Sequence, residues 1–237
     1  MPENRSAENE HAGRVRDMFA NIAGRYDLLN HLLSGNVDKR WRRVVAERIA
    51  AEVSVPDALV LDVACGTGDL AATLFEALDA KVFATDFCRP MLDIAATKIG
   101  QNVTLVESDA LHLPFSDSSF DVVTIGFGLR NLASLERGLA EFARVLKRGG
   151  WLAILEFSRP VNRALRVLFG TYFTRVLPVM GGIVSGSRSA YTYLPDSVKR
   201  FPDQRELAAL IEQAGFVEVC FENLTGGIAA LHLGKRP

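Results

Sequence analysis

Two acidic residues and a glycine-rich turn are spaced so that they could bind a nucleoside-like ligand. An apolar run over residues 59–63 contains Asp62, and the turn Gly66-Thr67-Gly68 follows it, ahead of a helix-compatible segment. Glycine permits backbone angles and a close ligand approach that a Cβ would block, and a helix that begins behind the turn offers free N–H groups. Asp86 stands 18 residues past Gly68, after a second apolar segment. Its carboxylate can accept hydrogen bonds from both hydroxyls of a ribose, so the pattern predicts a nucleoside site.

The same turn fits two classes of ligand. Residues 66–71 also match the G-x-G-x-x-G/A fingerprint of dinucleotide-binding proteins. Asp62 favours the other class, because an acid at the end of the first strand would repel a pyrophosphate and attract a cation. The amino and sulfonium groups of S-adenosylmethionine are such cations, so we favour a methyl donor over a nicotinamide dinucleotide. A third interpretation is that Asp62 only caps the turn.

The composition indicates one large α/β domain. The chain has 237 residues, of which 49% are apolar, enough for a core that is covered on both faces of a sheet. The net charge of −1 gives no indication of a nucleic-acid partner. The three cysteines fit no Cys-x-x-Cys spacing and the four histidines lack metal-site spacing, so we expect reduced thiols, no metal and a cytoplasmic location. We also expect no signal peptide, no membrane span, and a disordered polar segment over residues 1–11.

Apolar segments alternate with helical ones, which predicts a doubly wound, mostly parallel sheet. The expected parallel strands cover residues 59–63, 81–85, 103–107, 120–125 and 151–157, and residues 217–223 and 228–234 form a closing antiparallel pair. Helices are expected over residues 14–41, 46–53, 90–99 and 134–147, the last closed by Gly149-Gly150. A capping box that starts at Asp203 opens a further helix. Residues 159–201 have no clean period, and we interpret them as a lid, with an ordinary helical excursion on the sheet as the alternative.

The order of these elements resembles the class I S-adenosylmethionine-dependent methyltransferases, and shorter segments narrow the resemblance. Residues 26–30, 33–34 and Trp41 look like the N-terminal signature of the ubiquinone/menaquinone biosynthesis C-methyltransferases, and residues 144–158 look like their second signature. Residues 126–131 and 223–227 match the same family. Three positions depart from the family pattern. This chain has Asp38 where the family usually has a histidine and Arg148 where it usually has a proline. It has Gly126 where some members have a serine that contacts the donor.

The resemblance implies a Rossmann-like fold with a mostly parallel seven-stranded sheet, a C-terminal antiparallel hairpin and a helical lid. It divides the chain into an N-terminal helical cover, residues 1–55, and a donor-binding domain, residues 56–237, with the lid at residues 159–201. The cofactor it implies is S-adenosyl-L-methionine. Its methionine end would lie at Asp62, Gly66, Thr67 and Gly68, its ribose at Asp86, and its adenine at Asp109 and Ala110. The alternative for Asp109 is a turn cap.

The resemblance also implies methylation of a ring carbon in a prenylated quinol, demethylmenaquinol, with the benzoquinol precursor of ubiquinone as the alternative. Such a carbon is a poor nucleophile until the neighbouring hydroxyl begins to lose its proton. Arg130 could stabilise the developing oxyanion, and Asn131 could hydrogen-bond a ring oxygen. Tyr26 and Asp27 could relay the proton. The alternatives are a salt bridge for Arg130 and a core position for Tyr26.

The isoprenoid tail of such a substrate implies peripheral contact with a membrane, on the inner face of the plasma membrane. Moving the tail into water would cost about 0.8 kcal/mol per CH₂, so we expect the tail to stay in lipid or in an apolar groove. The candidates for lining that groove, or else for the core, are Leu165, Val167, Leu168, Phe169, Tyr172 and Phe173. A homodimer is left open.

Overall fold

The strands form one mostly parallel sheet, as the sequence predicts. The computed structural model describes residues 2–53, 57–172, 175 and 188–237. For residues 2–9, 28–33 and 188–192 it describes the backbone only. Within these ranges a seven-stranded sheet has the order β3-β2-β1-β4-β5-β7-β6. The strands are β1 Ala58–Val63, β2 Ala80–Asp86, β3 Thr104–Glu107, β4 Phe120–Gly126, β5 Leu146–Phe157, β6 Val217–Leu224 and β7 Ala229–Lys235. Neighbours from β3 to β5 pair in parallel, and β7 pairs antiparallel with both β5 and β6. The mostly parallel sheet with a closing antiparallel pair is therefore confirmed.

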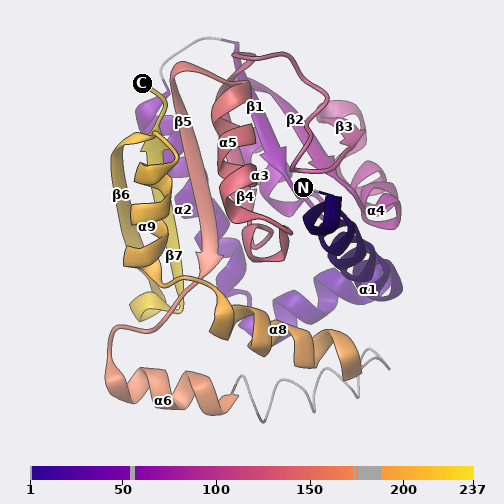
Figure 1. The fold of residues 1–237 in the computed structure, drawn as a ribbon, viewed down its shortest axis with the longest axis vertical. Helices are drawn as coiled ribbons and strands as arrows, with labels where there is room; N and C mark the ends of the chain where they lie inside the picture. Colours follow the sequence, from indigo (N-terminus) through magenta and orange to yellow (C-terminus); the bar gives the residue numbers. More distant parts are fainter. Residues whose placement is uncertain (1, 54–56, 173–174, 176–187) are drawn as a thin grey trace.

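Helices cover both faces of this sheet (Figure 1). They are α1 Pro2–Ser34, α2 Val37–Glu52, α3 Asp69–Ala77, α4 Arg89–Ile99, α5 Leu135–Val145, α6 Arg163–Thr171, α8 Arg188–Arg200 and α9 Gln204–Gln213, with 3₁₀ turns η1 Gly100–Asn102, η2 Leu129–Asn131 and η4 Thr225–Gly227. Successive strand residues point to opposite faces. Val60 thus packs under α2, α3 and α4, and its neighbour Leu61 packs under α5 and α9. No helix in the described ranges combines the length and hydropathy that crossing a bilayer requires.

The helix expected over residues 134–147 ends earlier than predicted. α5 ends at Val145, and Leu146 already has the extended backbone of β5. Gly149 and Gly150 lie inside β5, where Gly149 N–H donates to the Arg236 carbonyl and Arg236 N–H donates to the Gly150 carbonyl. A Cβ at Gly150 would come within 2.9 Å of two backbone carbonyl oxygens. Gly150 therefore serves a close strand contact, Gly149 supplies a φ of +78°, and neither residue ends the helix.

The polar N-terminal segment is helical where disorder was expected. α1 begins at Pro2 and continues without a break, and Glu10 pairs with Arg14 one turn further on at 2.6 Å. Val15 is buried, and His11 Nε2 lies 3.3 Å from the backbone oxygen of Asn131. The prediction of disorder over residues 2–11 is wrong, because tertiary contacts that the local sequence does not show hold this end of α1 against η2.

The described residues of the segment 159–201 lie beyond the carboxyl-terminal end of β5. The arrow of β5 points toward α6 and α8 in Figure 1, and α1 lies on the same side of the sheet. α8 packs on α1 and η2, and the inner side of α6 meets α1 and α8 through Phe169 and Tyr172. The described part of this segment thus covers the end of the sheet and does not pack on a sheet face. Phe173, one of the groove candidates, lies outside the described residues.

Candidate active site

A cavity of about 380 Å³ opens where the parallel strands end. Its wall combines α1, the turn after β1, the end of β2, the loop after β3, and the segment from β4 to η2. The size suits a ligand of nucleoside dimensions. The predicted site residues that line it are Tyr26, Asp62, Gly66, Thr67, Asp86, Asp109, Ala110 and Asn131. Asp27, Gly68 and Arg130 are not in the wall.

Asp62 faces this cavity with one unsatisfied oxygen. The β1–β4 register sets it opposite Thr124, whose hydroxyl donates to Asp62 Oδ1 at 2.7 Å. Asp62 Oδ2 is buried and has no hydrogen-bond partner among the described residues. Burial raises the pKa of Asp62 to about 7. A buried carboxylate with a free oxygen is costly, so this position is built for a ligand that brings a positive charge.

The two turn glycines have different tasks. Gly66 has a φ of +57° and its Cβ would meet only Tyr26 Cε1, at 3.9 Å, so it leaves open space on the cavity side. Gly68 has a φ of +82°, and its Cβ would lie 2.2 Å from Ile99 Cδ1 of α4. We infer that Gly66 gives room to a ligand, while Gly68 lets the turn pack against α4.

Asp86 organises the turn from the end of β2. Its Oδ2 accepts the Gly66 N–H and its Oδ1 accepts the Cys88 N–H, both at 2.8 Å. Burial raises the pKa of Asp86. A carboxylate has about four lone-pair sites, so acceptor capacity remains on the cavity side for hydroxyl donors.

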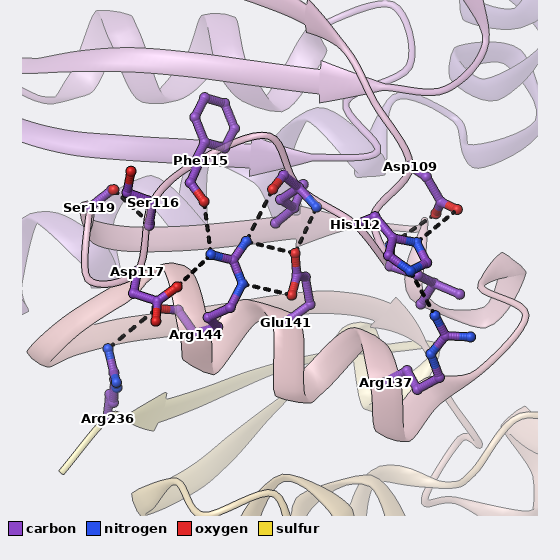
Figure 2. Close-up of polar contacts among 12 residues, drawn as sticks. Asp109, His112, Phe115, Ser116, Asp117, Ser119, Arg137, Glu141, Arg144 and Arg236 are labelled. Carbon is purple, nitrogen blue, oxygen red and sulfur yellow. Dashed lines mark hydrogen bonds and ion pairs between the residues drawn. The ribbon is translucent and has the colours of Figure 1, made fainter.

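The loop after β3 brings a second acid to the cavity. Asp109 Oδ1 accepts the Leu111 N–H at 2.9 Å, which is the turn cap that the sequence left open as an alternative. Figure 2 shows His112 between Asp109 and Arg137 of α5, with Arg137 donating to His112 Nε2 at 3.0 Å. His112 Nδ1 lies 3.8 Å from Asp109 Oδ2. Ala110, next to this cluster, is 7% exposed and forms part of the apolar wall.

An arginine of α5 holds the outer part of the same loop. Arg144 donates to the carbonyls of Phe115 at 2.8 Å and Leu113 at 3.0 Å, and it pairs with Asp117 and Glu141 (Figure 2). Glu141 in turn accepts the Leu113 N–H at 2.7 Å. These contacts fix the loop to α5, which positions the segment that begins at residue 109 against the cavity.

Asp27 ties α1 to the glycine turn. The Thr67 hydroxyl donates to Asp27 Oδ1, and Lys98 of α4 pairs with Asp27 Oδ2 at 2.9 Å. Lys98 also pairs with Asp69, the first residue of α3. The contacts make Asp27 an anchor for the cover over the site, and they engage both of its oxygens. The proton-relay role predicted for it stays a prediction.

Arg42 is a wall residue that the sequence reasoning missed. Its guanidinium lies 2.6 Å from Asp38 and 3.2 Å from Asp69, and its side chain is 10% exposed. Ser34 also donates to Asp38, at 2.6 Å. Asp38, a departure from the family pattern, is thus the buried partner of a cation at the Asp62 end of the cavity. In this place a guanidinium can neutralise the carboxylate of an amino-acid ligand. The available signal was the position of Arg42 directly after Trp41.

Arg130 lies behind the wall in a buried ion pair. Its Nη1 is 2.7 Å from Glu156 Oε1, with the two side chains 6% and 1% exposed. The same nitrogen donates to the Phe127 carbonyl, and the guanidinium lies 5.4 Å from the Phe157 ring centroid. The salt-bridge alternative is therefore present. Arg130 Nε is buried and has no partner among the described residues, so this N–H is still available as a donor and the catalytic role stays a prediction.

Asn131 joins the cover, the lid and the wall. Its Oδ1 accepts the hydroxyl of Tyr193 from α8 at 3.1 Å. Burial raises the pKa of Tyr193. Tyr193 had no sequence signal, because its partner lies 62 residues away.

Tyr26 lies in the wall edge-on to Phe19, with ring centroids 5.9 Å apart. His232 is buried, and its Nε2 lies 2.8 Å from the Gln204 carbonyl oxygen.

Comparison with solved structures defines the class of protein. The fold is similar to that of an S-adenosylmethionine-dependent methyltransferase, a possible histamine N-methyltransferase, from Thermotoga maritima, with a TM-score of 0.64 at 20% identity over 93% of this chain and 99% of that one. The fold is thus that of the class I S-adenosylmethionine-dependent methyltransferases, as the sequence predicts.

Sequence comparison defines the family. The model of the ubiE/COQ5 methyltransferase family matches residues 6–236. A demethylmenaquinone methyltransferase from Thermus thermophilus is 50% identical over 93% of this chain and 100% of its own length. A ubiquinone/menaquinone biosynthesis C-methyltransferase from Cellvibrio japonicus is 39% identical over 96% of this chain and 93% of its own length. The chain belongs to the ubiE/COQ5 methyltransferase family and is an S-adenosylmethionine-dependent C-methyltransferase. The match decides against a nicotinamide-dependent oxidoreductase.

The residues present fit the methyl donor that the family implies. The unpartnered Asp62 Oδ2 offers an acceptor for an ammonium group, and the open side of Gly66 leaves space for a ligand close to the backbone. Arg42 supplies the opposite charge nearby. The pairing of a buried anion with a buried cation suits the zwitterionic end of S-adenosylmethionine. Among the described residues, His, Cys, Asp and Glu side chains form no group of three that could hold a metal ion.

Proposed function

We propose that this enzyme transfers the methyl group of S-adenosylmethionine to a ring carbon of demethylmenaquinol, giving menaquinol. The proposal rests on the similarity to the demethylmenaquinone methyltransferase from Thermus thermophilus, which is 50% identical and aligns over its whole length. The benzoquinol precursor of ubiquinone is the second candidate, favoured by the relative from Cellvibrio japonicus.

Each donor-binding residue has a chemical task in this proposal. When bound, S-adenosylmethionine supplies an electrophilic methyl group on a positively charged sulfur. Asp62 accepts from the amino group and Arg42 faces the carboxylate, while Asp86 accepts from the ribose hydroxyls. Asp109 and Ala110 hold the adenine, with Asp109 Oδ2 accepting from its exocyclic amine. Gly66, Thr67 and Gly68 shape the turn between these groups.

The substrate must be activated on the other side of the cavity. A quinol carbon becomes nucleophilic when the neighbouring hydroxyl loses its proton. Arg130 lowers the pKa of that hydroxyl through its remaining N–H donor, directly or through a water, and Asn131 hydrogen-bonds a ring oxygen. Tyr26 lies in the wall, where it can pass the proton toward Asp27. The inward side chains of the lid, Phe169, Tyr172 and Tyr193, exclude water from the site once the substrate has entered.

A test with purified protein decides between the two quinols. The reduced short-chain demethylmenaquinone and the reduced short-chain benzoquinone precursor are each offered with labelled methyl donor. We expect incorporation into the naphthoquinol. In cells that lack this protein, mass spectrometry should find a menaquinone lighter by one methyl group. Incorporation into the benzoquinol alone would replace the first candidate by the second, and incorporation into neither would reject both.

Donor binding should release a proton below neutral pH. Because the folded pKa of Asp62 is raised to about 7, its carboxyl is protonated in the free protein at lower pH, and a bound ammonium group then lowers that pKa. Donor affinity should therefore rise as the pH increases toward 7. Calorimetry with S-adenosylhomocysteine, in buffers of different ionisation enthalpy, measures the released proton. Asp62→Asn should bind more weakly and release none. Equal proton release by Asp62→Asn would place the titration elsewhere.

Asp86→Asn should weaken donor affinity about tenfold to a hundredfold, the scale of a lost charge-assisted hydrogen bond. The carboxamide has one acceptor oxygen where the Gly66 and Cys88 N–H groups need two, so the turn and the ribose compete for it. Calorimetry with S-adenosylhomocysteine measures the change. Asp93→Asn is the matched control, since Asp93 is an exposed acid of α4 that pairs with Arg89 on the surface. Unchanged affinity of Asp86→Asn would remove Asp86 from the donor site.

The tail of the proposed substrate requires an enzyme that meets lipid. A prenyl chain stays in the bilayer at rest, because each exposed CH₂ costs about 0.8 kcal/mol in water. We therefore propose a cytoplasmic enzyme that works peripherally on the inner face of the plasma membrane. Oligomeric state is a separate question, and sedimentation of the purified protein would answer whether it is a homodimer.

A further inference from the structure

The helix α6 has two different apolar faces. Leu165, Phe169 and Tyr172 are half-buried. Phe169 and Tyr172 pack with α1 and α8, and Leu165 lies against the turn η4, where a Cβ on Gly226 would be 2.7 Å from Leu165 Cδ2. Asn162 caps the helix by accepting the N–H groups of the next turn. This inner face explains why α6 forms and where it is held.

The outer face of the same helix exposes apolar side chains in the described part of the chain. Val167 and Leu168 are 65% and 68% exposed, and Val161, just before the helix, is 61% exposed. These are three of the five large exposed hydrophobic side chains in the described part of the chain. The sequence suggested that Val167 and Leu168 line an enclosed groove or belong to the core. Their exposure shows that they do neither. A cluster of this kind is typical of a contact surface.

The charged residues of the chain segment that contains this face all have one sign. Between Glu156 and Asp196 the sequence has five arginines and no acidic residue, although the whole chain has a net charge of −1. Arg163 and Arg166 belong to α6 and are exposed. Exposed apolar side chains flanked by arginines are the composition of helices that lie in the interface of an anionic bilayer.

The inner face of α6 leads from this surface toward the cavity. The apolar cluster that holds Phe169 and Tyr172 also contains Phe19 and Tyr26 of α1, and these two residues line the cavity. Figure 1 shows α6 at the outer edge of the molecule, on the same side of the sheet as α1 and α8. A chain that enters beside α6 would meet apolar side chains all the way to the site.

We propose that the outer face of α6, formed by Val161, Val167 and Leu168 with Arg163 and Arg166, docks the enzyme on a bilayer of anionic lipids. The docking itself needs no quinol, and its use in delivering a tailed substrate rests on the proposed function. A second copy of the chain fits the face less well, because a symmetric contact would set the arginines of the two copies against each other.

The test is sedimentation of the full chain with vesicles. Vesicles of phosphatidylcholine with phosphatidylglycerol should carry down the wild type, and vesicles of phosphatidylcholine alone should carry down much less. Two double variants test the face: Val167→Ser/Leu168→Ser and Arg163→Gln/Arg166→Gln. Each should lower the partition constant for the anionic vesicles at least about tenfold. The matched control is Phe75→Ser/Val217→Ser, which removes two exposed apolar side chains elsewhere and should bind as the wild type does.

Activity on a soluble short-chain quinol separates this proposal from the proposed function. Both α6 variants should keep the wild-type kcat on that substrate without vesicles, and should lose activity only on a long-chain quinol in vesicles. Equal vesicle binding by wild type and both variants would overturn the docking surface. So would a wild-type dimer that becomes a monomer in Val167→Ser/Leu168→Ser. A wild type that binds vesicles and methylates no short-chain quinol would overturn the proposed function alone.

Discussion

Replacing Arg130 with leucine should lower the free energy of unfolding by about 3–5 kcal/mol, because it strands a buried charge. The Glu156 side chain is 1% exposed and has Arg130 as its cation at 2.7 Å. We also expect kcat to fall at least about a hundredfold, the usual effect of removing one oxyanion donor. The donor that we assign to the substrate is the Nε–H, which is buried and unpartnered in the free enzyme. Urea unfolding and steady-state kinetics measure the two effects.

A second substitution separates stability from catalysis. Glu156→Gln removes the stranded charge and keeps a carbonyl oxygen for the Phe157 N–H, which Glu156 accepts at 2.8 Å. Arg130→Leu/Glu156→Gln should therefore recover most of the stability and bind the donor normally, while kcat stays low. The single variant Glu156→Gln is the control. If kcat of the double variant returns to within a few-fold of this control, Arg130 serves only the ion pair.

The sheet and the donor half of the site could be predicted because their signals are local. A parallel strand buried on both faces is a continuous apolar run, and its end is marked by the polar residue that follows. Asp62, Gly66 and Asp86 stand directly at such ends, so the order of strands brings them together at one edge. The capping box at Asp203 is local in the same way, and both of its hydrogen bonds are present.

The contacts that sequence reasoning missed join residues far apart in the chain. Arg42 meets Asp69 across 27 positions, and Thr67 donates to Asp27 across 40 positions. No periodicity in either segment marks such a partner, so Asp27 was expected to be a proton relay and appears as an anchor. The prediction that Gly149-Gly150 ends the helix failed for a related reason. A glycine pair after a helical pattern usually ends the helix, but here the pairing of β5 with its neighbours begins first.

The same limit applied to the outer face of α6. Apolar residues in a stretch without a clean period could be core, groove or surface, and only the position of α6 relative to α1 and α8 decides among them. Leu165 and Phe169 turn inward, and Val167 and Leu168 turn outward. The arginines were visible in the sequence, but their meaning depends on the apolar side chains that they surround.

The reduced form of the substrate should be methylated, and the oxidised form should not. A quinone ring is electron-poor and has no hydroxyl proton to lose, so its carbon cannot attack an electrophilic methyl group. The quinol has both the electrons and the acidic proton. With activation by deprotonation, the rate should rise with pH until the activating hydroxyl is ionised. The chain has no Cys-x-x-Cys pair, so we expect the reductant to come from outside the enzyme.

The measurement is an anaerobic assay with a radiolabelled methyl donor and one short-chain demethylmenaquinone, with and without dithionite. We expect label in the product only when dithionite is present. Binding of S-adenosylhomocysteine, measured with and without dithionite, is the control that the reductant leaves the donor site unchanged. Arg130→Leu/Glu156→Gln in the same assay should shift the rise of rate to higher pH, because the group that lowers the pKa of the hydroxyl is gone. Equal incorporation into the oxidised ring would reject phenolate activation, and with it the roles assigned to Arg130, Asn131 and Tyr26.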